Sequence, residues 1–519
     1  MTEVLKRQIG QMVMIGIPGT AMPQEYKDLC AKYKIGNFCM SAANCVTTET
    51  LCGLVSDVRT FTYQQTGIYP FISIDQEGGW VTRLYDGAAM ISNAMSYSAI
   101  GADHAKMVQV GTKLGRILRA VGCNTDLAPV LDVNINPNSP CVSTRNYSDD
   151  PKKVAELGTG FLKGIESQRV MTTVKHFPGH GNASGDTHLY SAHNTVDKET
   201  LRKTEFLPFK RAFEAGAGAV MGAHATYDSY SNRPAILSGE IMTELLRGEM
   251  EFEGVAITDS MCMNAISVPY PKGEGAVQAI LAGCDILLYY PSGCAEIAQA
   301  FEAVYAAVES GRISETRIRE SWQRIQKQKA KYAVADCEPN LALAQKLTGN
   351  VADICEAYFD KLRSITCMKN DGVLDTLKNK KLLCIAPVCD AMRGVDESRR
   401  QILSFADVLC EEFPDAVACV SLLDRLTPEV ENAIQNDYDV AVLGIFNADI
   451  RPGQLAVLEA VQAKKKPVVA VLLSSPYDSK YVEGSNAIIT GYEYTMLSVK
   501  ALVQAIKEND YQGTLPVRI

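Results

Sequence analysis

Short, continuous apolar segments recur at wide intervals along the first 290 residues of the chain. Their residues do not alternate between apolar and polar, which is typical of strands buried on both faces of a parallel sheet. The stretches between them, such as HAKMVQVGTKLGRILRAVG, have apolar positions at helical spacing. The eight segments are QMVMIGI (11–17), IGNFCM (35–40), PFISID (70–75), NTDLAPV (124–130), VMTTVK (170–175), AVMGAH (219–224), GVAITD (254–259) and CDILLYY (284–290).

Eight strands that alternate with helices predict an α/β fold, a (β/α)₈ TIM-like barrel. Periodicity does not show closure, so a doubly wound sheet is the alternative. In a barrel, the active site lies at the C-terminal ends of the strands. Five polar residues fall at or just past that end of four segments, so we expect the functional site there. They are Asp75, Lys175, His176, His224 and Asp259.

The pattern changes after the eighth segment. It becomes long and helical from about 312 to 366, and a second set of apolar segments follows at the wide spacing of parallel strands with crossover helices. We expect a catalytic barrel over 1–335, a helical linker over 336–369 and a smaller α/β sandwich domain with a mainly parallel sheet over 370–519. The second set is KLLCIAPV (381–388), AVACVSLL (416–423), DVAVLGIF (439–446), KPVVAVLLSS (466–475) and AIITGYEY (487–494).

Composition narrows the class of protein. The 519 residues are 47% hydrophobic and carry a net charge of −9 without a long Lys/Arg run, which argues against a nucleic-acid or membrane partner. The N-terminal segment lacks a signal peptide's pattern, and apolar runs such as 467–473 are shorter than the roughly 18 residues that span a bilayer. We therefore expect a cytoplasmic protein. None of the 16 cysteines form a C-x-x-C pair, so reduced, buried thiols are expected.

Three of the six histidines lie in one segment, VKHFPGHGNASGDTH at 174–188. His176 and His180 have the four-residue spacing of two zinc ligands on a helix. Pro178 and Gly179 lie between them and oppose a continuous helix, so the segment is predicted to be a loop without a metal. No glycine-rich phosphate-binding fingerprint is present in the second half, so a nucleotide cofactor has no support.

The polar strand ends suit a neutral sugar, whose hydroxyl groups need rigid donors and acceptors. Four side chains could supply these groups, namely Asp75, Arg83, Lys175 and His176.

Cleavage of a glycoside also needs a carboxylate at the anomeric carbon and an acid at the leaving oxygen. Asp259 is a candidate for the first role, and His188, with Asp186 to orient it, for the second. The alternatives are that Asp259 caps a turn and that His188 is a solvated loop residue.

The segment KHFPGHG (175–181) followed by DTH (186–188) resembles the signature of glycoside hydrolase family 3, in its β-N-acetylglucosaminidase branch. The resemblance spans nearly the whole chain. Other matching segments are IGQMVMIGIPGT near the start, FISIDQEGG (71–79), LAPVLDVNINP (127–137), STRNYSDDP (143–151), GVAITDSM (254–261) and the C-terminal GYEYTMLSVKALVQAIKEN with GTLPVRI.

This resemblance implies a role for each candidate residue. Asp259 would be the nucleophile of a retaining reaction, and His188 the general acid/base with Asp186 as its dyad partner. No metal and no organic cofactor are implied. The residues implied to hold the sugar are Asp75, Arg83, Arg145, Lys175 and His176.

One position departs from the family pattern, since relatives commonly read GGRV where this chain reads GGWV. Trp80 is either a stacking platform beside the site or a packing residue. His180 is interpreted as structural, and His224 as either a pocket residue or a core residue.

The function expected from this resemblance is removal of terminal β-linked N-acetylglucosamine from small muropeptide- or chitin-derived glycosides. A β-N-acetylglucosaminide phosphorylase is the alternative, because a histidine acid/base tolerates an incoming phosphate better than a carboxylate does. A β-glucosidase is disfavoured because such relatives generally lack the KHFPGHG and DTH loop. A non-catalytic sugar-binding protein is disfavoured because Asp259 and His188 are both present.

Overall fold

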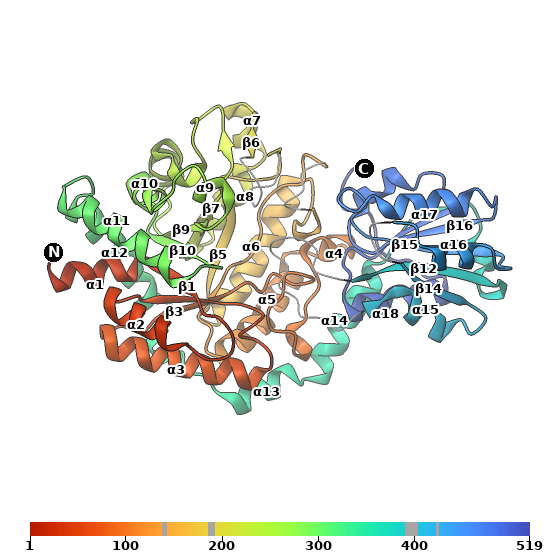
Figure 1. The fold of residues 1–519 in the computed structure, drawn as a ribbon, viewed down its shortest axis with the longest axis horizontal. Coiled ribbons are helices and arrows are strands. Elements are labelled where there is room, and N and C mark those ends of the chain that lie inside the picture. Colours follow the sequence, from red (N-terminus) through yellow and green to blue (C-terminus); the bar gives the residue numbers. More distant parts are fainter. Residues whose placement is uncertain (138–142, 185–191, 390–402, 422–424) are drawn as a thin grey trace.

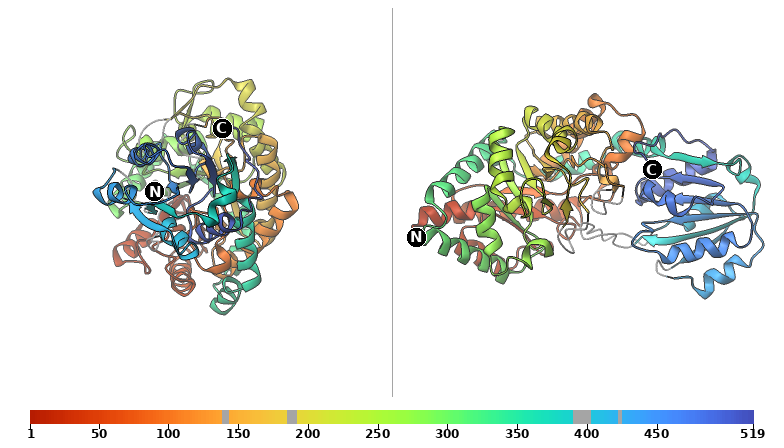
Figure 2. Two further views of the ribbon diagram at one scale, coloured as in Figure 1. Left: turned by 90° about the vertical axis from the view of Figure 1, so that its right-hand side faces the viewer. Right: turned by 90° about the horizontal axis from the view of Figure 1, so that it is seen from above.

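The computed structural model describes residues 1–137, 143–184, 192–389, 403–421 and 425–519. The molecule is elongated, with a barrel that contains the N-terminus at one end and a smaller α/β domain at the other (Figure 1). Two further views show the same separation along the long axis (Figure 2). None of the described helices is long and apolar enough to cross a membrane.

Eight parallel strands form a closed barrel, so the predicted barrel is confirmed and the open, doubly wound alternative is wrong. Each of the eight apolar segments supplies one strand. Their order around the barrel is β1-β10-β9-β7-β5-β4-β3-β2. The strands are β1 (Val13–Gly16), β2 (Asn37–Met40), β3 (Phe71–Ile74), β4 (Thr125–Asp126), β5 (Met171–Phe177), β7 (Ala219–Gly222), β9 (Val255–Ser260) and β10 (Ile286–Tyr289).

Helices surround the barrel. Several begin at residues whose side chains cap the first turn, as Asp103 does for α5 by accepting a hydrogen bond from the Lys106 amide. The helices are α1 (Glu3–Gln11), α2 (Gln24–Tyr33), α3 (Thr48–Thr66), α4 (Ala94–Ala99), α5 (His104–Ala120), α6 (Pro151–Ser167), α7 (Lys198–Lys203), α8 (Phe206–Glu214), the π-helix η4 (Glu240–Glu249), α9 (Asn264–Ser267), α10 (Glu274–Ala282), α11 (Cys294–Glu309) and α12 (Glu315–Lys331).

Short elements lie in the loops between barrel strands. β6 (His193–Asn194) and β8 (Thr226–Tyr227) pair in parallel and form a two-stranded sheet. The 3₁₀ turns of this domain are η1 (Gly87–Ala89), η2 (Ser143–Arg145), η3 (Ala235–Leu237) and η5 (Val334–Asp336).

Two helices, α13 (Leu341–Thr348) and α14 (Val351–Ser364), lead from the barrel to the second domain. The strand β11 (Thr366–Asn370) follows directly and pairs antiparallel with β17 (Ala487–Thr490). The sheet of the second domain therefore begins inside the segment that was expected to be helical. The residues TCMKN contain no continuous apolar run that could have indicated a strand.

The second domain is built on a mainly parallel sheet, as predicted. Its strand order is β11-β17-β16-β15-β12-β13, with β14 paired to β12. The other strands are β12 (Leu382–Cys389), β13 (Leu403–Ser404), β14 (Val417–Ser421), β15 (Val440–Ile445) and β16 (Val468–Leu472). The helices and turns are η6 (Leu374–Asn379), α15 (Phe405–Glu412), α16 (Pro428–Ile434), α17 (Gly453–Gln462), η7 (Pro476–Tyr481) and α18 (Met496–Glu508).

Alternate residues of the central strands enter two separate apolar cores. Val440 and Val442 of β15 face the core that contains α15 and α18. Ala441 and Leu443 face the core that contains α16 and α17. This alternation follows from the two-residue repeat of a strand, and it makes the domain a three-layer sandwich.

The C-terminal tail returns to the barrel after α18. The Thr514 amide donates to the Ala99 carbonyl at 3.0 Å, and the Ser148 hydroxyl donates to the Pro516 carbonyl at 2.8 Å. Val517 packs in a small buried cluster with Met95 of α4. The two domains are therefore tied together by the end of the chain as well as by the α13–α14 connection.

Candidate functional site

A polar cluster lies where β3 and β5 end. Asp75 directly follows β3, and its Oδ1 lies 2.8 Å from the Nζ of Lys175 on β5. Its Oδ2 lies 3.5 Å from an Nη of Arg83. These three residues were predicted to hold a sugar, and the barrel brings them together because parallel strands present their C-terminal ends at one rim.

Glu77 joins this cluster, although no role was predicted for it. Its Oε1 lies 2.6 Å from Lys175 Nζ, and both of its oxygens accept hydrogen bonds from Arg145, at 2.7 and 2.9 Å. The Glu77 side chain is 6% exposed. The signal in the sequence was an acidic residue two positions beyond Asp75, in the segment FISIDQEGG.

The charges in this cluster hold one another ionised. Burial by itself would raise the pKa of Glu77, but Arg145 and Lys175 outweigh it and bring that pKa well below its usual range. Burial would lower the pKa of Lys175, and the carboxylates of Asp75 and Glu77 raise it above the ordinary value instead. The ion pairs thus favour the charged forms of Glu77 and Lys175, although both side chains are buried at the rim of the barrel.

Asp132 positions His176, near the end of β5, and His180, in the loop that follows β5. Its Oδ2 lies 2.7 Å from Nδ1 of His176, and its Oδ1 accepts from the backbone amides of His176 and His180, at 3.2 and 2.7 Å. Asp132 is fully buried. Burial would raise its pKa, but the interactions with His176 outweigh burial and lower it. In the sequence, Asp132 lies just beyond NTDLAPV and inside the matching segment LAPVLDVNINP, and no role was predicted for it.

His180 is buried, and burial lowers the pKa of its imidazole. Within the described residues, neither ring nitrogen has a hydrogen-bond partner. Its ring centroid lies 6.2 Å from that of His176, edge to face, and Asp259 is among the charges that act on it. His180 thus lies beside His176 and close enough to Asp259 to be affected by its charge.

Asp259 lies near the end of β9 and is partly exposed. Its Oδ1 accepts a hydrogen bond from the Ser260 amide at 2.7 Å. His224, just beyond β7, is buried, and its Nε2 lies 2.8 Å from the Ser260 carbonyl. His224 therefore contacts the backbone at the end of β9, at the residue next to the candidate nucleophile.

Asp186 and His188, the predicted proton-transfer pair, lie outside the described residues. The chain on either side of them is held together. Ser184 and His193 exchange two backbone hydrogen bonds, at 2.9 and 3.1 Å. Glu205 accepts from the Asn182 amide and from the Asn194 side chain, both at 2.8 Å.

Trp80 is a packing residue. Its side chain is 3% exposed and belongs to the apolar core of the second domain on the α15 and α18 side. Its Nε1 donates to the Thr144 hydroxyl at 3.2 Å. A buried ring of this kind offers no face to a sugar.

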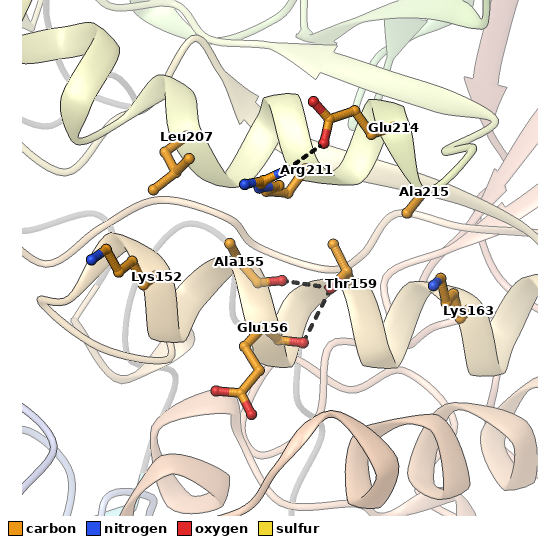
Figure 3. A pocket seen from close by; sticks show the side chains of 9 residues that line it. All are labelled: Lys152, Ala155, Glu156, Thr159, Lys163, Leu207, Arg211, Glu214 and Ala215. Carbon is orange, nitrogen blue, oxygen red and sulfur yellow. Dashed lines mark hydrogen bonds and ion pairs between the residues drawn. The ribbon is translucent and has the colours of Figure 1, made fainter.

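A hollow of about 540 Å³ lies on the outer surface, between α6 and α8 (Figure 3). Arg211 and Glu214 form an ion pair of 2.8 Å across its α8 side. None of its lining residues belongs to the predicted site. Among the described residues, no group of three His, Cys, Asp or Glu side chains is arranged to hold a metal ion.

A closed parallel barrel that gathers carboxylates, an ammonium, guanidiniums and imidazoles at one rim defines a barrel enzyme with a polar binding site. The chain belongs to glycosyl hydrolase family 3, whose N-terminal domain model matches residues 4–328. It is thus a glycosidase, and the resemblance seen in KHFPGHG is confirmed.

Relatives cover nearly the whole chain. A solved β-N-acetylglucosaminidase of this family from Paenibacillus sp. str. FPU-7 is 30% identical and covers 100% of this chain and 99% of its own, with a TM-score of 0.92. The β-hexosaminidase A of Pseudoalteromonas piscicida is 29% identical over 92% of this chain and 86% of its own length. A fungal multi-domain β-N-acetylglucosaminidase is 28% identical, with a TM-score of 0.88 over 99% of this chain and 60% of its own.

Proposed function

We propose that this protein is a retaining hydrolase that removes terminal β-linked N-acetylglucosamine from small glycosides of muropeptide or chitin origin. The observation that carries the proposal is the position of Asp259. It lies at the same barrel rim as the cluster of Asp75, Glu77, Arg145 and Lys175, where a carboxylate can face the anomeric carbon of a bound sugar. The names of the full-length relatives support the choice of sugar.

The rim cluster and His176 would bind the sugar hydroxyls. Lys175 Nζ and the Arg83 guanidinium are donors, and Asp75 is an acceptor with 20% of its side chain exposed. Because their partners already hold these groups, binding costs little side-chain entropy. Asp132 holds Nδ1 of His176, which leaves Nε2 for the ligand.

In the first chemical step, the Asp259 carboxylate attacks the anomeric carbon and the bond to the aglycone oxygen breaks. The imidazolium of His188, oriented by Asp186, gives its proton to that oxygen. In the second step, neutral His188 takes a proton from water while the water oxygen attacks the anomeric carbon. The β-configured sugar leaves and the Asp259 carboxylate is restored. The roles of Asp186 and His188 rest on the DTH segment.

The test is turnover of a chromogenic β-N-acetylglucosaminide by the folded, full-length protein, with and without phosphate. We expect free N-acetylglucosamine, released with the β-configuration, in both conditions. Sugar 1-phosphate as the main product would show that the reaction is phosphorolysis rather than hydrolysis. An α-configured first product would contradict the retaining mechanism, and no turnover in either condition would contradict the proposed activity.

A further inference from the structure

The turn after β3 is inserted between the two domains. Trp80, at its tip, lies in the second domain's apolar core, which also contains Tyr494 and Leu502. The turn is closed by the amides of Glu77 and Gly78, which both donate to the Val81 carbonyl, at 3.0 and 3.3 Å. The side chain that anchors this turn therefore belongs to the barrel sequence but packs in the other domain.

A buried carboxylate of the second domain closes the other side of the turn. Glu493 is fully buried, and its Oε2 accepts from the Asn93 amide at 3.0 Å. Its Oε1 is paired with the buried ammonium of Lys361 on α14. Gly79 has a positive φ of 60°, and a Cβ there would lie 2.6 Å from Glu493 Oε2. Glu493 is thus seated directly against the glycine turn.

The anchored turn carries sugar-site residues on both of its arms. Glu77 lies three positions before Trp80, and Arg83 lies three positions after it. Trp80 Nε1 also donates to the hydroxyl of Thr144, the residue before Arg145, which pairs with Glu77. A displacement of the Trp80 ring would therefore move the loops after both β3 and β4.

We infer that the second domain is a positioning element of the sugar site, and that Trp80 and Glu493 transmit its effect through the Gly78–Gly79 turn. The inference rests on the proposed function for the identity of the sugar. The placement of Glu77 and Arg83 depends on the contact between the turn and the second domain because both residues lie on the arms of the turn. Arg145 depends on it because it is hydrogen-bonded to Glu77. Trp80 and Glu493 are positioning residues, since neither lies among the groups that would touch the sugar.

The variants Trp80→Ala and Glu493→Gln test this inference. We expect each to raise KM for the chromogenic N-acetylglucosaminide about tenfold or more, at a temperature where the protein is fully folded, because small misplacements of binding groups are costly. Trp80→Phe keeps most of the packing, so its KM should lie close to that of the wild-type protein. The double variant Lys361→Met/Glu493→Gln removes both buried charges, in case Glu493→Gln alone fails to fold.

Leu409→Ala is the matched control. Leu409 is fully buried in the same apolar core, on α15. The Leu409→Ala substitution should lower Tm, as Trp80→Ala should, but it should leave KM and kcat unchanged. If Trp80→Ala and Glu493→Gln also lower only Tm, the contact is merely structural and the inference is wrong.

Hydrogen exchange separates this inference from the proposed function. In Glu493→Gln and Trp80→Ala, the amides of Glu77 and Gly78 should exchange at least about tenfold faster, while those of β3 keep their protection. This result requires no turnover, so an inactive wild-type protein would contradict the proposed function and leave the positioning role testable. Unchanged exchange at both amides would overturn the positioning role.

Discussion

The two oxygens of Glu77 accept hydrogen bonds from Nε and Nη2 of Arg145, at 2.9 and 2.7 Å. This bidentate ion pair joins the loop after β3 to the η2 turn after β4. Because a guanidinium and a carboxylate match in geometry, the pair fixes orientation as well as distance. Lys175 of β5 completes the link across three neighbouring strands.

Glu77→Gln is expected to disorganise the proposed sugar site. The variant removes the charged carboxylate that accepts both hydrogen bonds from the buried Arg145, and it weakens the contact to Lys175. We expect kcat/KM to fall about 100-fold and the free energy of unfolding to fall by about 3–5 kcal/mol. Steady-state kinetics and urea denaturation check these values. The control is Glu244→Gln, at an exposed position of η4, and equal effects of the two substitutions would refute the assigned role.

Asp132→Asn is expected to change the hydrogen-bonding state of His176. Asp132 accepts at Nδ1 of this ring at 2.7 Å, whereas an asparagine can also present an N–H there. The tautomer with the proton on Nε2 then becomes favourable, and the ring loses its acceptor toward the sugar. We expect a rise in KM with a shifted pH dependence of kcat/KM. Nitrogen NMR of the imidazole identifies the tautomer, and an unchanged spectrum would exclude this explanation.

Asp259→Ala is expected to abolish turnover. The proposed nucleophile has no substitute within the variant, so kcat should fall by about four orders of magnitude or more, as it does when a nucleophile is removed from other hydrolases. The binding of N-acetylglucosamine, measured by calorimetry, should persist because the rim cluster is intact. Near-native turnover would show that another group forms the glycosyl-enzyme.

His188→Ala is expected to act selectively on the leaving group. A nitrophenol leaves without protonation, whereas a sugar or alkyl alcohol needs a proton from the acid. We therefore expect kcat for an N-acetylglucosamine disaccharide to fall far more than that for the nitrophenyl glycoside in the glycosylation step. Equal losses for both substrates would argue against His188 as the acid.

Glu205 should make stability depend on pH. Burial raises its pKa to about 8 in the folded protein, against about 4.3 in an unfolded chain. Its contribution to stability is therefore fully present below about pH 4.3 and is lost as pH rises toward the folded pKa, by at most about 1.4 kcal/mol per pH unit.

Glu205→Gln removes this dependence. The free energy of unfolding of the wild type, relative to the variant, should fall steadily between about pH 4.5 and 8. Urea denaturation across this range measures the difference, with Glu199→Gln at an exposed position of α7 as the control. Parallel pH curves for wild type and Glu205→Gln would contradict the raised pKa.

Local sequence determined the strands and the rim residues that end them. The eight apolar segments of the barrel are continuous in the chain, and a strand buried on both faces requires such a run. Asp75, Lys175, His176 and Asp259 could be placed because they lie at or just past the ends of three such segments. The edge strand β11 was missed because TCMKN carries no such run.

Tertiary structure decided what these residues meet. Glu77 and Asp132 lie beyond their strand ends, and their importance arises only when the loops after β3, β4 and β5 come together around Lys175 and His176. The choice between stacking and packing for Trp80 depended on a core formed more than 280 residues away in the sequence, around Phe405 and Tyr494. Periodicity reports the burial of a segment within its own element, whereas charge pairing and domain contacts depend on residues that only folding makes neighbours.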